Sequence, residues 1–129
     1  MRVFVNIATY NEKENIADLI KGILALEVPD LKIIVIDDSS PDGTAEIVRQ
    51  NFIDRGIEII VRKGERGYGS AHIRGFKEAL NQQADIIITM DADLSHQPKV
   101  IPLKTSNHCF LSFLTLISVK PALYKRESR

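Results

Sequence analysis

The 129-residue sequence contains a single cysteine, Cys109, which excludes an internal disulfide and fits a reducing compartment. It has no apolar stretch close to the roughly 20 residues that a membrane-spanning helix needs, and no apolar leader with a cleavage site. Its 17 basic and 17 acidic residues give zero net charge, so no overall field favours nucleic acid. The remaining composition, 44% apolar and 26% charged, predicts one soluble domain with a core of its own.

Short apolar runs alternate with segments of helical periodicity along most of the chain. Asn11 and Glu14 have the spacing of a capping box, which predicts that Asn11 caps the first helix. The β-α-β-α-β-α-β order with short links predicts a parallel sheet with helices on its faces, a three-layer α/β/α fold. We expect strands at 3–7, 32–36, 57–61 and 85–90, and helices at 13–25, 44–55 and 70–81.

Two carboxylates, Asp91 and Asp93, follow the fourth predicted strand. Side chains at i and i+2 of an extended segment point the same way, so both could bind one hard cation. Mg²⁺ and Mn²⁺ are such cations, and they complete their ligand shells with water and substrate phosphates. Because Asp-x-Asp is a common sequence, a solvated acidic turn is the alternative.

Polar residues also follow the other three predicted strands. Tyr10 to Glu12 come after the first strand, Asp37 and Asp38 after the second, and the glycine-rich loop 62–69 after the third. In a parallel sheet all these ends lie at one edge, where open α/β sheets bind their ligands. Four polar clusters at one edge favour a ligand site over a solvated turn.

Three other phosphate-binding folds fit the sequence less well. No Gly-x-x-x-x-Gly-Lys-Ser/Thr motif occurs, which excludes a P-loop. The glycines at 64, 67 and 69 lack the Gly-x-Gly-x-x-Gly spacing and follow the third strand, which argues against a nicotinamide-binding fold. An aspartyl-phosphate phosphatase would carry its Asp-x-Asp after the first strand.

Four stretches resemble the inverting GT-A glycosyltransferases of family 2, and within them the dolichol-phosphate mannose synthases. They lie at 6–12, 35–44, 67–71 and 90–98, and the most specific read Asp-Asp-Ser-Ser-Pro-Asp-Gly-Thr and Met-Asp-Ala-Asp-Leu-Ser-His. The resemblance implies a Rossmann-like nucleotide-diphospho-sugar transferase fold. It also implies metal-dependent transfer of mannose from GDP-mannose to dolichyl or another polyprenyl phosphate at a membrane surface.

Two alternatives to mannose transfer stay open. The first is transfer of glucose from UDP-glucose to dolichyl phosphate on a related scaffold. The second is a catalytically dead nucleotide-binding fragment, because the half of the family's site that holds the acceptor is missing from the sequence.

The resemblance also implies roles for individual residues. Asp38 matches a carboxylate that reads a base N–H, and Ala8 replaces a usual proline. Asp91 and Asp93 are the implied catalytic carboxylates and, with Ser95, the implied ligands of Mg²⁺ or Mn²⁺. The implied nucleotide-sugar contacts are Ala8, Tyr10, Glu12, Ile36, Asp38, Asp91 and Ala92.

The resemblance covers residues 2–102, so we expect a GT-A domain at 1–102 and an atypical tail at 103–129. The charge also changes along the chain, with 11 basic and 16 acidic residues in 1–93 but six and one in 94–129. We interpret the chain as truncated or frame-shifted, with the fourth strand left as an exposed edge. A short amphipathic membrane contact is the alternative for the tail. The expected location is cytoplasmic, peripheral at the cytosolic face of a membrane.

Several basic and histidine side chains have no role in this interpretation. We expect His72 on a helix surface, whereas His96 lies beside the acidic motif and either contacts phosphate or makes a structural hydrogen bond. Arg62, Lys63 and Arg66 either form a solvated loop or contact phosphate or an anionic membrane.

Overall fold

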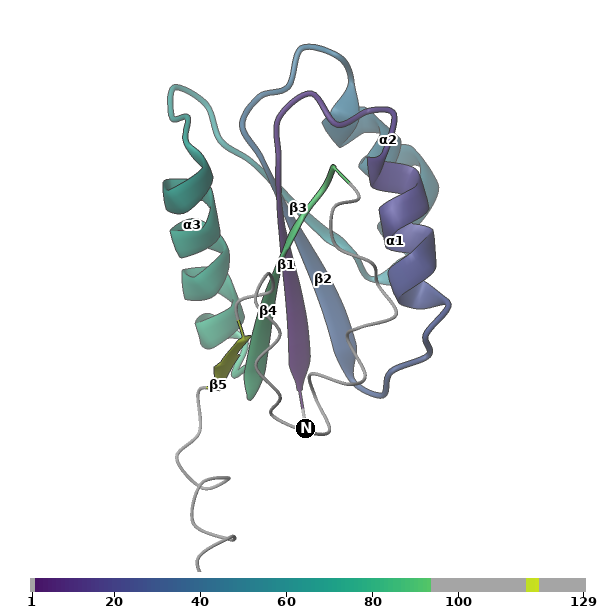
Figure 1. The fold of residues 1–129 in the computed structure, drawn as a ribbon, viewed down its shortest axis with the longest axis vertical. Helices are drawn as coiled ribbons and strands as arrows, with labels where there is room; N and C mark the ends of the chain where they lie inside the picture. The colour runs from purple at the N-terminus through teal and green to yellow at the C-terminus, as the bar shows by residue number, and fades with distance from the viewer. Residues whose placement is uncertain (1, 94–115, 119–129) are drawn as a thin grey trace, which may run out of the picture.

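The computed structural model describes residues 2–93 and 116–118. Figure 1 shows one twisted sheet with α3 on one face and α1 and α2 on the other. This confirms the predicted three-layer α/β/α arrangement. The strands are β1 (Val3–Thr9), β2 (Leu31–Asp37), β3 (Glu58–Val61), β4 (Ile86–Asp91) and β5 (Leu116–Ser118), and the helices are α1 (Ile16–Leu24), α2 (Thr44–Phe52), the short 3₁₀ turn η1 (Ile53–Arg55) and α3 (Tyr68–Asn81).

The strand order is β3-β2-β1-β4-β5, and the first four of these strands are parallel. β5 pairs antiparallel with β4, with Leu116 opposite Ile88 and Ser118 opposite Ile86. The prediction that β4 forms an exposed edge is therefore wrong for these residues, because a segment of the tail supplies a partner strand. Within the part of the chain that the structure describes, no helix is both long and apolar enough to cross a bilayer.

The sheet separates two apolar cores because alternate residues of a strand point to opposite faces. One core lies under α1 and α2, and α1 contributes the stripe that its periodicity predicts: Ile16, Leu19, Ile20 and Ile23, all fully buried. The other core lies under α3 and contains Phe4, Ile34, Ile36, Ala71, Ala79 and Ile87.

The predicted capping box at Asn11 is wrong. Helix α1 begins at Ile16 with Asn15 as its N-cap, and Asn11 lies in the left-handed region with φ of 55°. The reason is a set of long-range hydrogen bonds that hold the preceding loop against the β2–α2 loop. The amide N–H groups of residues 11, 12 and 13 donate to Ser40 Oγ (2.9 Å), Thr44 Oγ1 (3.1 Å) and Asp42 Oδ2 (3.1 Å).

Gly75 allows α3 to lie close to the sheet. A Cβ added at this position would lie 2.7 Å from Asn6 Nδ2 and 2.7 Å from Ile36 Cδ1, which is closer than side chains pack. The small residues predicted for this helix therefore do allow close contact with the strands.

We expect Gly75→Ala to lower the free energy of unfolding by about 1–3 kcal/mol, since overpacking outweighs the better helix propensity of alanine. Urea unfolding followed by circular dichroism measures the change. Gly69→Ala in the same helix is the matched control, because no atom lies within 4 Å of its added Cβ. Equal unfolding midpoints for both variants would contradict the close packing.

Candidate functional site

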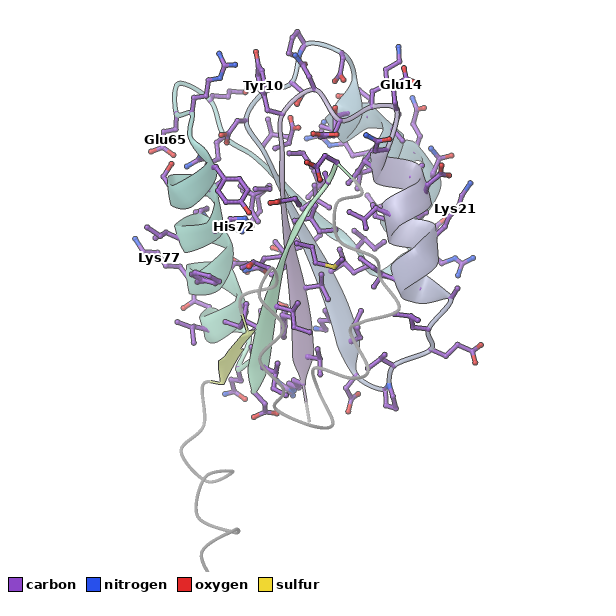
Figure 2. The ribbon with its side chains drawn as sticks, in the orientation of Figure 1. Tyr10, Glu14, Lys21, Glu65, His72 and Lys77 are labelled. Carbon is purple, nitrogen blue, oxygen red and sulfur yellow. The ribbon has the colours of Figure 1, made fainter. Side chains whose placement is uncertain are left out.

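A cavity of about 380 Å³ opens at the edge where the parallel strands end. It receives residues from the loops after β1, β2 and β3 and from the end of β4, so the four predicted polar clusters do meet. Figure 2 shows Tyr10 at this upper edge and His72 lower down, between α3 and the sheet. The lining residues are Ala8, Thr9, Tyr10, Glu12, Asp38, Arg66, Gly67, Tyr68, Ala71, Asp91, Ala92 and Asp93.

Most of the residues assigned to the nucleotide sugar by resemblance line this cavity. Ile36 does not: its side chain is fully buried in the core beneath α3, where it faces Gly75. Ser95 and His96 lie outside the described residues. The role assigned to each residue stays a prediction, but the shared cavity places seven of them within reach of one ligand: Ala8, Tyr10, Glu12, Asp38, Asp91, Ala92 and Asp93.

Asp38 forms a buried ion pair with Arg62. Arg62 Nε donates to Asp38 Oδ1 at 2.6 Å and Arg62 Nη2 to Asp38 Oδ2 at 2.8 Å, while the Gly67 N–H donates to the same Oδ2 at 3.0 Å. Both side chains are almost fully buried. Burial alone would raise the pKa of Asp38, but the hydrogen bonds from Arg62 and Gly67 outweigh it and hold this pKa below its usual value.

This ion pair bears on the roles predicted for Arg62 and for Asp38. Arg62 is not part of a solvated loop, so that expectation is wrong for this residue. A carboxylate has about four acceptor sites, and three donors already use Asp38. One acceptor site therefore remains for a base N–H, which keeps the predicted role of Asp38 chemically possible.

The neighbouring Asp37 has a structural role. Its carboxylate is fully buried and accepts hydrogen bonds from Thr9 Oγ1 (2.7 Å), Ser40 Oγ (2.6 Å) and the Ser40 N–H (2.9 Å). These bonds join the ends of β1 and β2 to the loop that leads into α2. Asp37 thereby holds the walls of the cavity without lining it.

Tyr68 is a site residue that the sequence did not reveal. It is the first residue of α3, and its hydroxyl donates a hydrogen bond to Asp91 Oδ1. Partial burial, together with the hydrogen bond to Asp91, raises the pKa of Tyr68. The only sequence feature that could have pointed to Tyr68 is its position between Gly67 and Gly69, next to the loop that precedes the helix. The bond orients one of the two carboxylates that the sequence assigns to a cation.

We expect Tyr68→Phe to weaken binding of Mn²⁺ in the presence of nucleotide by about tenfold, since partners that orient a metal ligand have effects of that size. Titration of Mn²⁺, followed by the electron paramagnetic resonance of the free ion, measures this affinity. The fold should be unchanged, because Tyr68 is 58% exposed. Unchanged or tighter Mn²⁺ binding would contradict an orienting role.

His72 lies one turn after Tyr68 and is buried, so the prediction of a surface position is wrong. It shares the sheet-facing side of α3 with Ala71, Gly75 and Ala79, and this helical spacing could have revealed its burial. The Tyr68 and His72 rings meet edge to face, with centroids 4.4 Å apart. Burial lowers the pKa of His72, although the charge of Asp91 opposes the shift. His72 is therefore a neutral imidazole whose ring packs against the ring of Tyr68.

Arg66 covers one face of Tyr10. Its guanidinium carbon lies 3.8 Å from the centroid of the Tyr10 ring, and both residues line the cavity. Arg66 follows Gly64 and precedes Gly67, whose φ angles of 74° and 143° let the loop turn toward this ring. The loop thus brings a cation and an aromatic surface to the same part of the cavity.

The two carboxylates at the end of β4 fit a hard divalent cation that is shared with a ligand. Asp91 and Asp93 both line the cavity. Within residues 2–93 and 116–118, no group of three or more His, Cys, Asp or Glu side chains could hold a metal. Two oxygen ligands suit Mg²⁺ or Mn²⁺, which take further ligands from phosphates and water, better than a closed zinc site.

Residues 4–103 match the sequence profile of the glycosyl transferase family 2. The chain belongs to this family. A dolichol-phosphate mannosyltransferase from Pyrococcus furiosus is 46% identical over 103 residues, which are 79% of this chain and 28% of that protein. An undecaprenyl-phosphate mannosyltransferase from Micrococcus luteus is 40% identical over 103 residues, or 79% of this chain and 42% of that protein.

The family's fold is also found among solved structures. A mannosyltransferase from Pyrobaculum calidifontis, solved in complex with GDP-Man and Mn²⁺, superposes with a TM-score of 0.64 at 29% identity. The match covers 71% of this chain and 27% of that structure. This confirms the predicted GT-A fold and family. The chain spans less than half the length of each of these relatives.

Proposed function

We propose that this family 2 domain binds GDP-mannose and takes part in transferring mannose to a polyprenyl phosphate. The observation that carries the proposal is the single cavity lined by Tyr10, Asp38, Asp91 and Asp93. Two relatives named as polyprenyl-phosphate mannosyltransferases and a solved relative holding GDP-Man and Mn²⁺ support the same donor and acceptor.

The position of each side chain suggests its part in binding the donor. Tyr10 offers an aromatic face for the base, which would displace or stack beside the Arg66 guanidinium. The remaining acceptor site of Asp38 can take a base N–H, and the fixed ion pair with Arg62 orients it. Asp91 and Asp93 would hold Mg²⁺ or Mn²⁺ next to the diphosphate.

The reaction would transfer the sugar from one phosphate oxygen to another. When bound, the divalent cation would offset the charge that builds on the departing nucleoside diphosphate. The acceptor phosphate is already ionised near neutral pH, so the protein has to position and desolvate it rather than deprotonate it.

We also infer that the protein works at the cytosolic face of a membrane as a peripheral protein, because the proposed acceptor is a lipid. A nucleotide-binding fragment without catalysis is the second candidate function. The chain matches 28% and 42% of the length of the two relatives.

Radiolabelled GDP-mannose, polyprenyl phosphate in detergent and Mn²⁺ test the proposal directly. We expect label to pass into the lipid fraction with the 129-residue chain and to stay in the aqueous phase with Asp93→Ala. Binding of GDP without transfer would establish the nucleotide-binding fragment instead. Transfer from UDP-glucose but not from GDP-mannose would replace mannose by glucose.

A further inference from the structure

A second cavity of about 490 Å³ lies along the outer side of α3 and the loop that precedes this helix. It shares Arg66 with the candidate site, and its other lining residues are Arg62, Gly64, Glu65, Ser70, Ile73, Arg74 and Lys77. Basic side chains dominate its walls: Arg62, Arg66, Arg74 and Lys77 face a single acid, Glu65. The mechanism proposed above uses neither Arg74 nor Lys77.

The positive charge of this cavity is only partly neutralised by the protein. Arg62 is paired with Asp38 and lies 3.6 Å from Glu65. Arg74 is 43% exposed, and its Nη1 lies 3.4 Å from Glu78 Oε2, a weak surface contact. Lys77 forms no ion pair within the described residues, and Figure 2 shows it projecting outward from α3. At least two cations are therefore available to an anionic ligand.

The same outer face of α3 carries large apolar side chains. Ile73 is 54% exposed and Leu80 is 48% exposed. With Lys77 they have the spacing i, i+4, i+7, so the three lie on one stripe of the helix. The opposite side of α3 is already buried on the sheet through Ala71, Gly75 and Ala79. The outer stripe therefore combines exposed apolar and basic residues, the pattern that binds an anionic bilayer surface.

We propose that the outer face of α3, formed by Arg66, Ile73, Arg74, Lys77 and Leu80, docks on an anionic lipid membrane. Lipid phosphates would contact the cations of the cavity, and Ile73 and Leu80 would enter the boundary between headgroups and acyl chains. The charge complementarity selects this occupant, since Arg66, Arg74 and Lys77 outnumber the lining acid Glu65, while Arg62 is held by Asp38. This inference rests on the proposed function, because docking would bring the site to a lipid acceptor.

Docking through this face would also place the candidate site near the membrane. Helix α3 begins at Tyr68, whose hydroxyl contacts Asp91, and Arg66 lines both cavities. The donor site is thus connected to the docking face by one short loop and the first turn of the helix. A lipid phosphate acceptor would then need to leave the bilayer surface only slightly.

Co-sedimentation with vesicles tests the docking face without any nucleotide. The full chain is mixed with phosphatidylcholine vesicles, with or without phosphatidylglycerol. We expect binding to the anionic vesicles, and about 25-fold weaker binding for the double variant Arg74→Gln/Lys77→Gln, at about fivefold for each charge removed. The matched control is Lys21→Gln/Arg49→Gln, which removes the same charge from exposed positions on the opposite face. We expect this control to bind nearly as well as the original chain.

Both double variants keep the basic tail, so the difference between them reports on α3 alone. Equal losses in the two would overturn the proposal, because they would reflect total charge. Binding of inorganic phosphate without binding to anionic vesicles would also overturn it, and would assign the cavity to a free phosphate. The double variant Ile73→Ser/Leu80→Ser should also bind anionic vesicles more weakly than the original chain.

GDP titration of the original chain separates the two proposals. If the chain binds anionic vesicles but does not bind GDP, only the proposed function is contradicted.

Discussion

Replacing Arg62 by alanine is expected to lower the free energy of unfolding by about 3–5 kcal/mol, which is the effect of removing one partner of a buried ion pair. The variant leaves the Asp38 carboxylate buried, with the Gly67 N–H as its one remaining donor among the described residues. It also removes the hydrogen bonds from Arg62 to Ser70 Oγ and the Gly67 carbonyl, which join the end of β3 to the start of α3. Urea unfolding followed by circular dichroism measures the loss.

Arg66→Ala is the matched control for this prediction, because Arg66 is an exposed arginine of the same loop. Its contact with the Tyr10 ring should contribute about 0.5–1 kcal/mol. The double change Asp38→Leu/Arg62→Met should recover much of the stability, since replacing both partners of a buried pair is often nearly neutral. Equal unfolding midpoints for Arg62→Ala and Arg66→Ala would contradict the importance of the pair.

The same pair predicts how stability changes with pH. The native pKa of Asp38 lies below its unfolded value of about 3.9, so its stabilisation is present above that pH and is lost as the pH falls through the native pKa. In Arg62→Ala, burial acts without the counterion and raises this pKa. The gap in stability between the original chain and Arg62→Ala should therefore narrow as the pH falls from the raised pKa of Asp38 in the variant, above about 3.9, to its lowered pKa in the original chain.

The second large effect is expected at the acidic pair. Asp93→Ala should weaken binding of Mn²⁺ in the presence of GDP by more than about 100-fold, since even residues that only orient a metal ligand account for about 10–100-fold. The fold should be retained because Asp93 is exposed. Isothermal titration with Mn²⁺, at a fixed concentration of GDP, measures the affinity.

Asp18→Ala is the control for Asp93→Ala, because it removes an exposed carboxylate of α1 that does not line the cavity. It should bind Mn²⁺ and GDP like the original chain. Nearly equal affinities for the two variants would mean that Asp93 is not a ligand. The cation would then have to be held by other groups, and the resemblance-based assignment would fail at its most specific motif.

The architecture could be predicted from the sequence because local patterns determine most of it. The run Ile33 to Ile36 predicts a strand buried on both faces, and these four residues are buried. The spacing of apolar residues in α1 predicts the face that packs on the sheet. Parallel strands then bring their carboxyl ends together regardless of the detailed packing, which is why the cavity residues could be predicted as a group.

The pairings inside the site could not be predicted in the same way. Asp38 and Arg62 lie 24 residues apart, and Tyr68 and Asp91 lie 23 residues apart, so neither contact has a local signal. Asn11 has the sequence of a helix cap but forms a hydrogen bond to Ser40 in another loop. Tertiary contacts therefore override local propensity where loops from different strands meet, and this is where the site lies.

The edge of β4 is a further case of a long-range contact. The change of charge and the end of the family resemblance near residue 102 gave no reason to expect a strand in the tail. Leu116 to Ser118 nevertheless pair with β4. Backbone hydrogen bonds form between strands whatever their side chains, so an apolar run of the tail can cover an edge without any family-specific sequence.

Calorimetric titration of the chain with GDP and with UDP, each with and without Mn²⁺, tests the central claim most directly. We predict that GDP binds more tightly than UDP and that binding requires Mn²⁺, because the two carboxylates can hold the diphosphate only through a cation. The absence of binding to either nucleotide, in a chain shown to be folded by circular dichroism, would contradict the assignment of this cavity as a nucleotide site.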